Sequence, residues 1–99
     1  MYDKILKKMR RAARAGRMIF VDHAFNELGN QDFSEADALN AIMTGEIIED
    51  QFDENYGDIK YKLCGDSRDG RELALIIKSD RYENVVIITA WWVKYSDYE

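Results

Sequence analysis

Residues 73–93 read LALIIKSDRYENVVIITAWWV, and this stretch decides the fold. It holds two continuous apolar runs, 73–77 and 85–93, on either side of the polar segment 80–84. Apolar runs of this length, rich in β-branched and aromatic residues, are typical of buried strands. We therefore expect two strands at the centre of a sheet, joined by a hairpin loop.

Two more strands are predicted upstream of this hairpin. In residues 59–63, apolar side chains alternate with lysines, which is typical of a strand with one solvated face. Residues 46–52 begin with Glu-Ile-Ile-Glu and predict the other strand. The polar segments around Gly57 and Gly70 predict turns, because Gly, Asn and Asp tolerate left-handed backbone.

The first part of the chain predicts helices. Over residues 2–15, apolar side chains recur with the 3.6-residue period of a helix, and Gly16 is a natural stop. Residues 18–21 predict a short strand or an extended lead-in. A second helix is expected over about residues 23–28, with Asp22 as its N-cap.

A third helix is predicted from Ser34 to Thr44, ending at Gly45. Ser34 with Asp37 three residues later is close to a capping box. Helices followed by an antiparallel meander indicate the α+β class. The sequence thus predicts a single α+β domain over residues 1–99, with N-terminal helices followed by a four-stranded, mainly antiparallel sheet.

Composition limits the classes of protein to which the chain can belong. Its 99 residues are 46% hydrophobic and 12% aromatic, which fits a folded domain with its own core. We find no apolar run near the roughly 20 residues of a membrane span, no signal-peptide pattern and no second cysteine to pair with Cys64. We therefore expect a cytoplasmic protein that does not enter a membrane.

Charge is distributed unevenly along the chain. Residues 1–17 carry seven basic residues and one acidic residue, whereas the remainder carries seven basic and 18 acidic residues, for a net charge of −5. On the first helix, the basic residues lie opposite the apolar stripe. That face is either a solvated helix surface or a surface for an anionic ligand, in which case Lys7, Arg11 and Arg14 bind substrate.

Several short motifs, in their order and spacing, resemble the family called domain of unknown function 4258. Together they span nearly the whole chain. They are Tyr2-Asp3-Lys4-Ile5-Leu6, His23-Ala24, Gly45-Glu46-Ile47-Ile48-Glu49, Gly70-Arg71-Glu72-Leu73 and Ile87-Ile88-Thr89-Ala90-Trp91.

The resemblance implies a small α+β fold similar to RelE and barnase-like toxin nucleases. It also implies a ribonuclease-type toxin, with a small zinc-finger antitoxin as its protein partner. Members of the family typically carry two arginines after the His-Ala pair, at the positions of Glu27 and Gln31 here. Two cationic candidates for phosphate binding are therefore absent from this chain.

An endoribonuclease that works without a metal needs groups for proton transfer and cations for the phosphate. His23 is the candidate acid and base, since imidazole titrates near neutrality. Arg71 is the candidate for a bidentate phosphate contact. Thr89 and Trp91 share one face of a strand by its period of two, and they can supply a hydrogen bond and a stacking platform for RNA.

Each of these residues also has a structural interpretation. His23 can be a capping or packing residue, Arg71 can pair with an acid, and Trp91 can belong to the core. The acidic residues form no recognisable acid–base pair, and Glu27 is expected to be exposed on its helix.

The sequence lacks zinc-ligand spacing and a glycine-rich nucleotide loop, so we expect no metal and no cofactor. The alternative to a nuclease is a non-catalytic protein-interaction domain on the same scaffold. Such a domain can self-associate as a homodimer through Trp92, Tyr95 and Tyr98.

Overall fold

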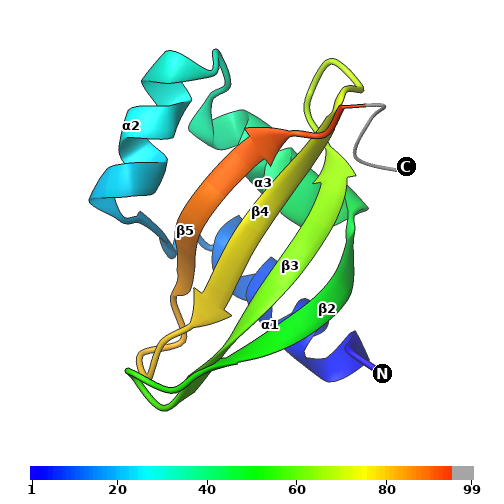
Figure 1. Ribbon diagram of the computed structural model, residues 1–99. Coiled ribbons are helices and arrows are strands. Elements are labelled where there is room, and N and C mark those ends of the chain that lie inside the picture. Colours follow the sequence, from blue (N-terminus) through cyan, green and yellow to red (C-terminus); the bar gives the residue numbers. More distant parts are fainter. Residues whose placement is uncertain (95–99) are drawn as a thin grey trace.

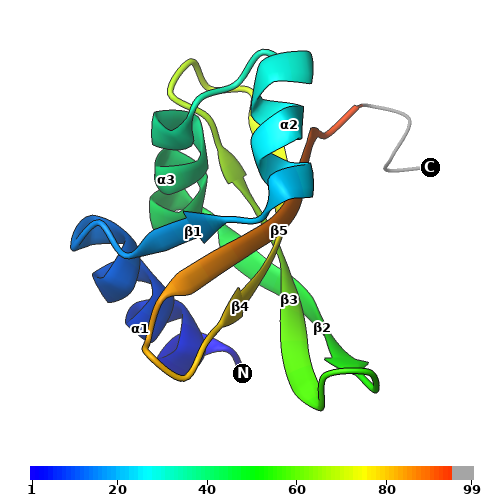
Figure 2. The same ribbon diagram turned by 90° about the vertical axis from the view of Figure 1, so that its left-hand side faces the viewer.

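The computed structural model describes residues 1–94 of the chain and confirms the α+β class, with three helices and a five-stranded mixed sheet. Helices α1 and α3 cover one face of the sheet and α2 lies beside β5, whereas no helix within residues 1–94 covers the other face (Figures 1 and 2). In chain order the elements are α1 (Asp3–Arg14), β1 (Met18–Phe20), α2 (Asp22–Asn30), α3 (Glu35–Thr44), β2 (Glu46–Asp53), β3 (Asp58–Asp66), β4 (Glu72–Ser79) and β5 (Val85–Trp92).

Helix α1 lies within one residue of its predicted bounds at each end, and its apolar stripe is buried. Arg10 reaches from α1 to the C-terminal end of α3. Its Nε donates to the carbonyl of Ile42 at 3.0 Å, and its Nη2 donates to the carbonyl of Gly45 at 2.7 Å. Because the last carbonyls of a helix lack partners within the helix, these bonds satisfy them and join the two helices.

Helix α3 has the predicted capping box. The Ser34 hydroxyl accepts from the amide of Asp37 at 3.2 Å, and the Asp37 carboxylate accepts from the amide of Ser34 at 2.9 Å. The helix also lies very close to β3, because a Cβ built on Gly65 would lie 2.1 Å from the carbonyl oxygen of Ala41. A glycine in a strand interior permits this close approach of two backbones.

The strand order in the sheet is β1-β5-β4-β3-β2. Strands β2 to β5 form an antiparallel meander, whereas β1 pairs in parallel with residues 85–87 of β5. The prediction of a four-stranded sheet is therefore wrong, because residues 18–20 form a fifth strand. Three residues carry too little pattern to distinguish a strand from an extended connection.

Helix α2 begins at Asp22 and continues through Gly29 to Asn30. Val21 occupies the N-cap position and no side chain caps the helix, so the prediction of Asp22 as N-cap is wrong. Only Ala24 of this helix is fully buried, and the helix packs mainly against β5. One face of α2 therefore lies along β5, the strand that carries the predicted site residues Thr89 and Trp91.

Candidate functional site

The two faces of the sheet differ in what they expose. Leu63, Leu75 and Ala90 lie side by side on β3, β4 and β5 and are fully buried on the face that the helices cover. Successive side chains of a strand alternate between the two faces. The opposite side, which we call the open face, therefore presents the rows Lys62–Ile76–Thr89 and Cys64–Ala74–Trp91.

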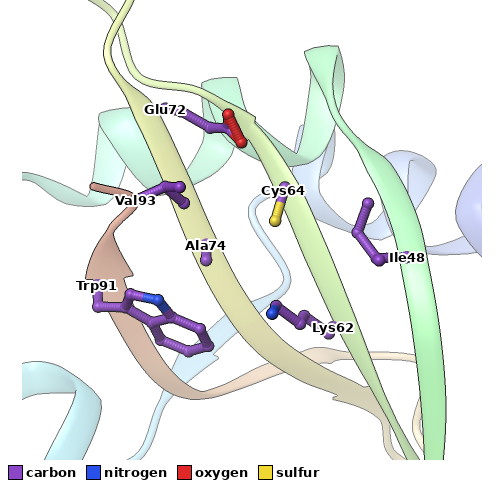
Figure 3. Close-up of a pocket in the computed structure, with 7 residues that line it drawn as sticks. All are labelled: Ile48, Lys62, Cys64, Glu72, Ala74, Trp91 and Val93. Atoms are coloured by element: carbon purple, nitrogen blue, oxygen red, sulfur yellow. The ribbon is translucent and has the colours of Figure 1, made fainter. Parts of the chain in front are cut away.

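A pocket of about 440 Å³ lies in the open face (Figure 3). The Trp91 indole lies on one side of it, and the Lys62 amine is 5.7 Å from the centroid of the Trp91 ring. An aromatic plane beside an amine suits a nucleotide, whose base stacks on the ring while its phosphate meets the cation. The lining residues are Ile48, Lys62, Cys64, Glu72, Ala74, Trp91 and Val93.

Cys64 lies in the floor of this pocket, beside Lys62 and Glu72 (Figure 3). Burial raises the pKa of the Cys64 thiol, and the charge of Glu72 raises it further. Since the thiolate is the nucleophilic form of cysteine, these effects disfavour Cys64 as a nucleophile. The pocket is therefore suited to binding rather than to covalent chemistry at this thiol.

Three side chains converge on the Glu27 carboxylate between α2 and β5, namely His23, Gln31 and Thr89. We call these four residues the Glu27 cluster. His23 Nε2 lies 2.8 Å from Glu27 Oε1, and the Thr89 hydroxyl donates to the same oxygen at 2.5 Å. Gln31 Nε2 donates to Glu27 Oε2 at 2.7 Å. The Glu27 side chain is only 13% exposed, whereas the His23 side chain is 72% exposed. The cluster thus holds one solvent-facing imidazole against a largely buried carboxylate.

The helical period explains why these side chains meet. His23, Glu27 and Gln31 are spaced four residues apart, so they lie on one face of α2. Strand β5 lies against this helix and brings Thr89 to Glu27. The structure therefore brings together two of the three predicted catalytic residues, His23 and Thr89, through a glutamate.

Arg71, the third predicted catalytic residue, lies at the other end of α2. Its guanidinium is 3.9 Å from the centroid of the Trp92 ring, and Trp92 Nε1 donates at 2.5 Å to the carbonyl of Gln31, the residue that follows the helix. A helix rises 1.5 Å per residue, so the eight positions from His23 to Gln31 correspond to about 12 Å. Arg71 is therefore not placed beside His23.

The loop before β4 fixes the position of Arg71. Its Nε donates to the carboxylate of Asp69 at 2.9 Å, and its amide donates to the buried Ser67 hydroxyl at 3.2 Å. Hydrogen bonds from the Ser67 hydroxyl and from the Arg71 amide hold the pKa of Asp69 below its usual value. Asp69 remains an anion at neutral pH and holds the guanidinium near Trp92.

The predicted substrate-binding residues do not form one site. Lys7, Arg11 and Arg14 are exposed on α1, where they border an open depression of about 430 Å³. Helix α1 covers one face of the sheet, whereas Trp91 lies in the open face (Figures 1 and 2). The basic helix and the tryptophan therefore belong to opposite sides of the molecule.

Comparison with known protein families identifies a match to most of the chain. The family model called domain of unknown function (DUF4258) matches residues 20–92. The chain belongs to this family. Within the DUF4258 match lie the whole Glu27 cluster, Lys62, Arg71 and Trp91, whereas α1 lies outside it. Neither the curated proteins nor the solved structures that were searched include a match to this chain.

Among residues 1–94, no helix is both long and apolar enough to cross a membrane. Over the same residues, no group of three or more His, Cys, Asp or Glu side chains is placed to hold a metal ion.

The sequence interpretation missed the part that Glu27 plays. Its expected exposure is wrong, because β5, His23 of the same helix and Gln31 after that helix enclose the carboxylate. The four-residue spacing from His23 to Glu27 to Gln31 is a signal that could identify the cluster. Nothing in the sequence, however, indicates that β5 lies against this face of α2.

The predicted homodimer contact falls partly outside the described residues, because Tyr95 and Tyr98 follow residue 94. Trp92 itself packs edge-on against Phe33, with ring centroids 5.8 Å apart and an interplanar angle of 83°. Together with its contacts to Arg71 and Gln31, this packing gives Trp92 a structural role within the chain.

Proposed function

We propose that this DUF4258 domain is a metal-independent endoribonuclease with a RelE or barnase-like fold, acting as the toxin of a toxin–antitoxin pair. The contact between the largely buried Glu27 carboxylate and the exposed His23 imidazole carries the proposal. A carboxylate that accepts a hydrogen bond from an imidazole fixes the tautomer and orientation of that ring. The open sheet face supports the same function, as does the toxin-nuclease fold that the resemblance to this family implies.

The proposed proton transfer uses the outer nitrogen of His23. Since Nε2 faces Glu27, its N–H donates to the carboxylate and Nδ1 is left to accept a proton. Nδ1 takes the proton of an RNA 2′-hydroxyl, the 2′-oxygen bonds to phosphorus, and the bond from phosphorus to the 5′-oxygen breaks. The imidazolium then returns the proton to the departing 5′-oxygen. Glu27 is a positioning residue in this step.

Binding is assigned to the open face and to the far end of α2. In the proposal, an unpaired base stacks on Trp91 and a phosphate meets the Lys62 amine. Arg71 contacts the phosphate of a neighbouring nucleotide, because it lies near the end of α2 opposite His23. Thr89 supports Glu27 rather than the substrate, since its hydroxyl already donates to that carboxylate.

The test compares the wild-type protein with the variants His23→Ala and Glu27→Gln, and with Asn26→Ala as the matched control on the exposed side of α2. Each purified protein is incubated with a 5′-labelled single-stranded RNA in excess EDTA. We expect wild type and control to release fragments that end in a 2′,3′-cyclic phosphate. His23→Ala should lower the rate by about 100-fold or more, as expected on loss of a general acid–base group.

A second RNA, with 2′-deoxynucleotides at the cleaved positions, should resist cleavage because it lacks the attacking hydroxyl. In cells, wild-type expression should arrest growth, and co-expression of a small zinc-finger antitoxin should restore it. Cleavage that survives His23→Ala in a folded protein would contradict the assignment of His23.

A second candidate function is the non-catalytic protein-interaction domain. It is favoured by Glu27 and Gln31, which stand where the family typically carries arginines and are hydrogen-bonded to each other. In that case, the Glu27 cluster serves only to join α2 to β5. Unchanged growth at high soluble expression, together with intact RNA in the cleavage assay, would select this function.

A further inference from the structure

Strand β2 forms an edge of the sheet. Only β3 pairs with it, so one side of its backbone has no strand partner in residues 1–94 (Figure 1). The start of β2 lies beside the first residues of α1, and a register shift separates Ile47 from Glu49. From Glu49 to Asp53 the pairing with β3 is regular. An edge strand of this kind presents amide and carbonyl groups to which another strand can pair.

Large apolar side chains are exposed around this edge. Phe52 is 65% exposed, its register partner Ile59 on β3 is 45% exposed, and Ile48 is 56% exposed. Ile48 lies on the open face, at the border of the pocket (Figure 3). Apolar side chains gathered at an exposed strand edge are typical of interaction sites.

The same segment is strongly acidic. Residues 46–58 contain six acidic residues and no basic residue. Asp53 pairs with Lys60, and Asp58 pairs with Lys78. The other four acids form no ion pair within the described part of the chain: Glu46, Glu49, Asp50 and Glu54.

This charge identifies the kind of partner that fits. A second copy of β2 would bring acidic side chains opposite acidic side chains, which destabilises a strand pair. The basic residues of α1 cannot take the place of a strand, because the backbone groups of α1 are paired within the helix. We propose that the free edge of β2 binds an extended basic segment of a partner protein, which adds to the sheet as a sixth strand along residues 49–53.

In this arrangement the backbone of the added strand supplies affinity and its side chains supply specificity. Its Lys or Arg side chains face Glu49 and Asp50, and its apolar side chains contact Phe52 and Ile48. The site lies on different elements from the Glu27 cluster, so it does not depend on nuclease activity.

The test uses a fluorescent ten-residue peptide in which pairs of Lys alternate with pairs of Val, so that lysines project from both faces of the added strand. The comparison peptide is N-methylated at every residue, so that neither of its edges can donate backbone hydrogen bonds. Fluorescence anisotropy gives the Kd of each peptide for the full chain. The edge variant is Glu49→Lys with Asp50→Lys. The control variant is Glu35→Lys with Glu83→Lys, which makes the same charge change at exposed positions away from β2.

We expect the edge variant to bind the Lys–Val peptide about tenfold more weakly than the control variant, because two cross-strand attractions become repulsions. For the wild-type chain, the N-methylated peptide should bind about tenfold more weakly than the unmethylated peptide. Equal affinities of the two variants, equal affinities of the two peptides, or no binding at all would overturn the proposal. Thermal melts establish that both variants are folded.

Discussion

Glu27 is the residue on which the candidate site depends, because its side chain is only 13% exposed and accepts hydrogen bonds on both oxygens. Glu27 is held by His23 of its own helix, by Gln31 directly after that helix, and by Thr89 of β5. The contact across elements is the bond from Thr89, which is separated from Glu27 by 62 positions in sequence. Local spacing therefore predicts the two helical contacts, whereas the third depends on how α2 packs.

This difference leads to a prediction for Thr89→Val, which keeps the shape of the side chain and removes its donor. We expect the free energy of unfolding to fall by about 1–2 kcal/mol, because a largely buried carboxylate oxygen loses a hydrogen bond. The comparison is His23→Ala, which should cost less than about 1 kcal/mol since the imidazole is mostly exposed. Urea unfolding of both variants is the measurement. A larger loss for His23→Ala would contradict this account of the cluster.

At the scale of whole elements, the sequence predicts helices better than it predicts their contacts. The apolar period of residues 2–15 and the Ser34–Asp37 box gave correct helices, because both signals act within one or two turns. β1 could not be predicted as a strand of the sheet, since its parallel partner is far away along the chain. The close contact between α3 and β3 likewise joins segments that are far apart in the sequence. It leaves no room for a Cβ at Gly65.

Gly65→Ala tests this contact. The added Cβ would lie 2.1 Å from a backbone oxygen, which cannot move as a flexible side chain can. We expect a loss of about 1–3 kcal/mol in the free energy of unfolding, as for other overpacked positions. Gly29→Ala is the matched control, because this helical glycine has nothing within 4 Å of an added Cβ. Alanine there should raise stability by up to about 1 kcal/mol. Urea denaturation that gave both changes the same sign would refute the close approach.

The capping box of α3 predicts a dependence on pH. Partial burial by itself would raise the pKa of Asp37. Hydrogen bonds from Ser34 and from the Arg68 amide outweigh this effect, so the pKa lies below its ordinary value of 3.8. A group with a lowered folded-state pKa stabilises the protein above its unfolded pKa, and this contribution is lost as the pH falls through the folded pKa.

Asp37→Asn should therefore cost about 1 kcal/mol at pH 7, the usual value of a helix cap. The difference from wild type should shrink as the pH falls below 3.8. Thermal unfolding across pH 2.5–7, at values chosen to span about one unit either side of the ordinary Asp pKa, is the measurement. Glu35→Gln in the first turn of the same helix should change much less, and a pH-independent loss for Asp37→Asn would contradict the mechanism.

At the scale of the whole molecule, three surfaces of different character lie on different sides. The open face carries Trp91 and Lys62, α1 carries exposed basic residues, and the edge of β2 is acidic and apolar. The sequence shows which segments are basic and which are acidic. It does not show on which surfaces they lie, because that depends on how the helices pack on the sheet. A partner strand at the β2 edge would contact Ile48 and would therefore adjoin the pocket of the open face.

The position of β5 between β1 and β4 has a consequence for synthesis on the ribosome. Residues 18–20 emerge early, yet their strand partner follows only after residues 21–84 have been made. At about 5–20 residues per second, β1 and the apolar side of α1 wait for several seconds without the strand that completes their layer. The nascent domain is therefore incomplete until residues 85–92 have left the exit tunnel, and during that interval its apolar segments lack the strand that covers them.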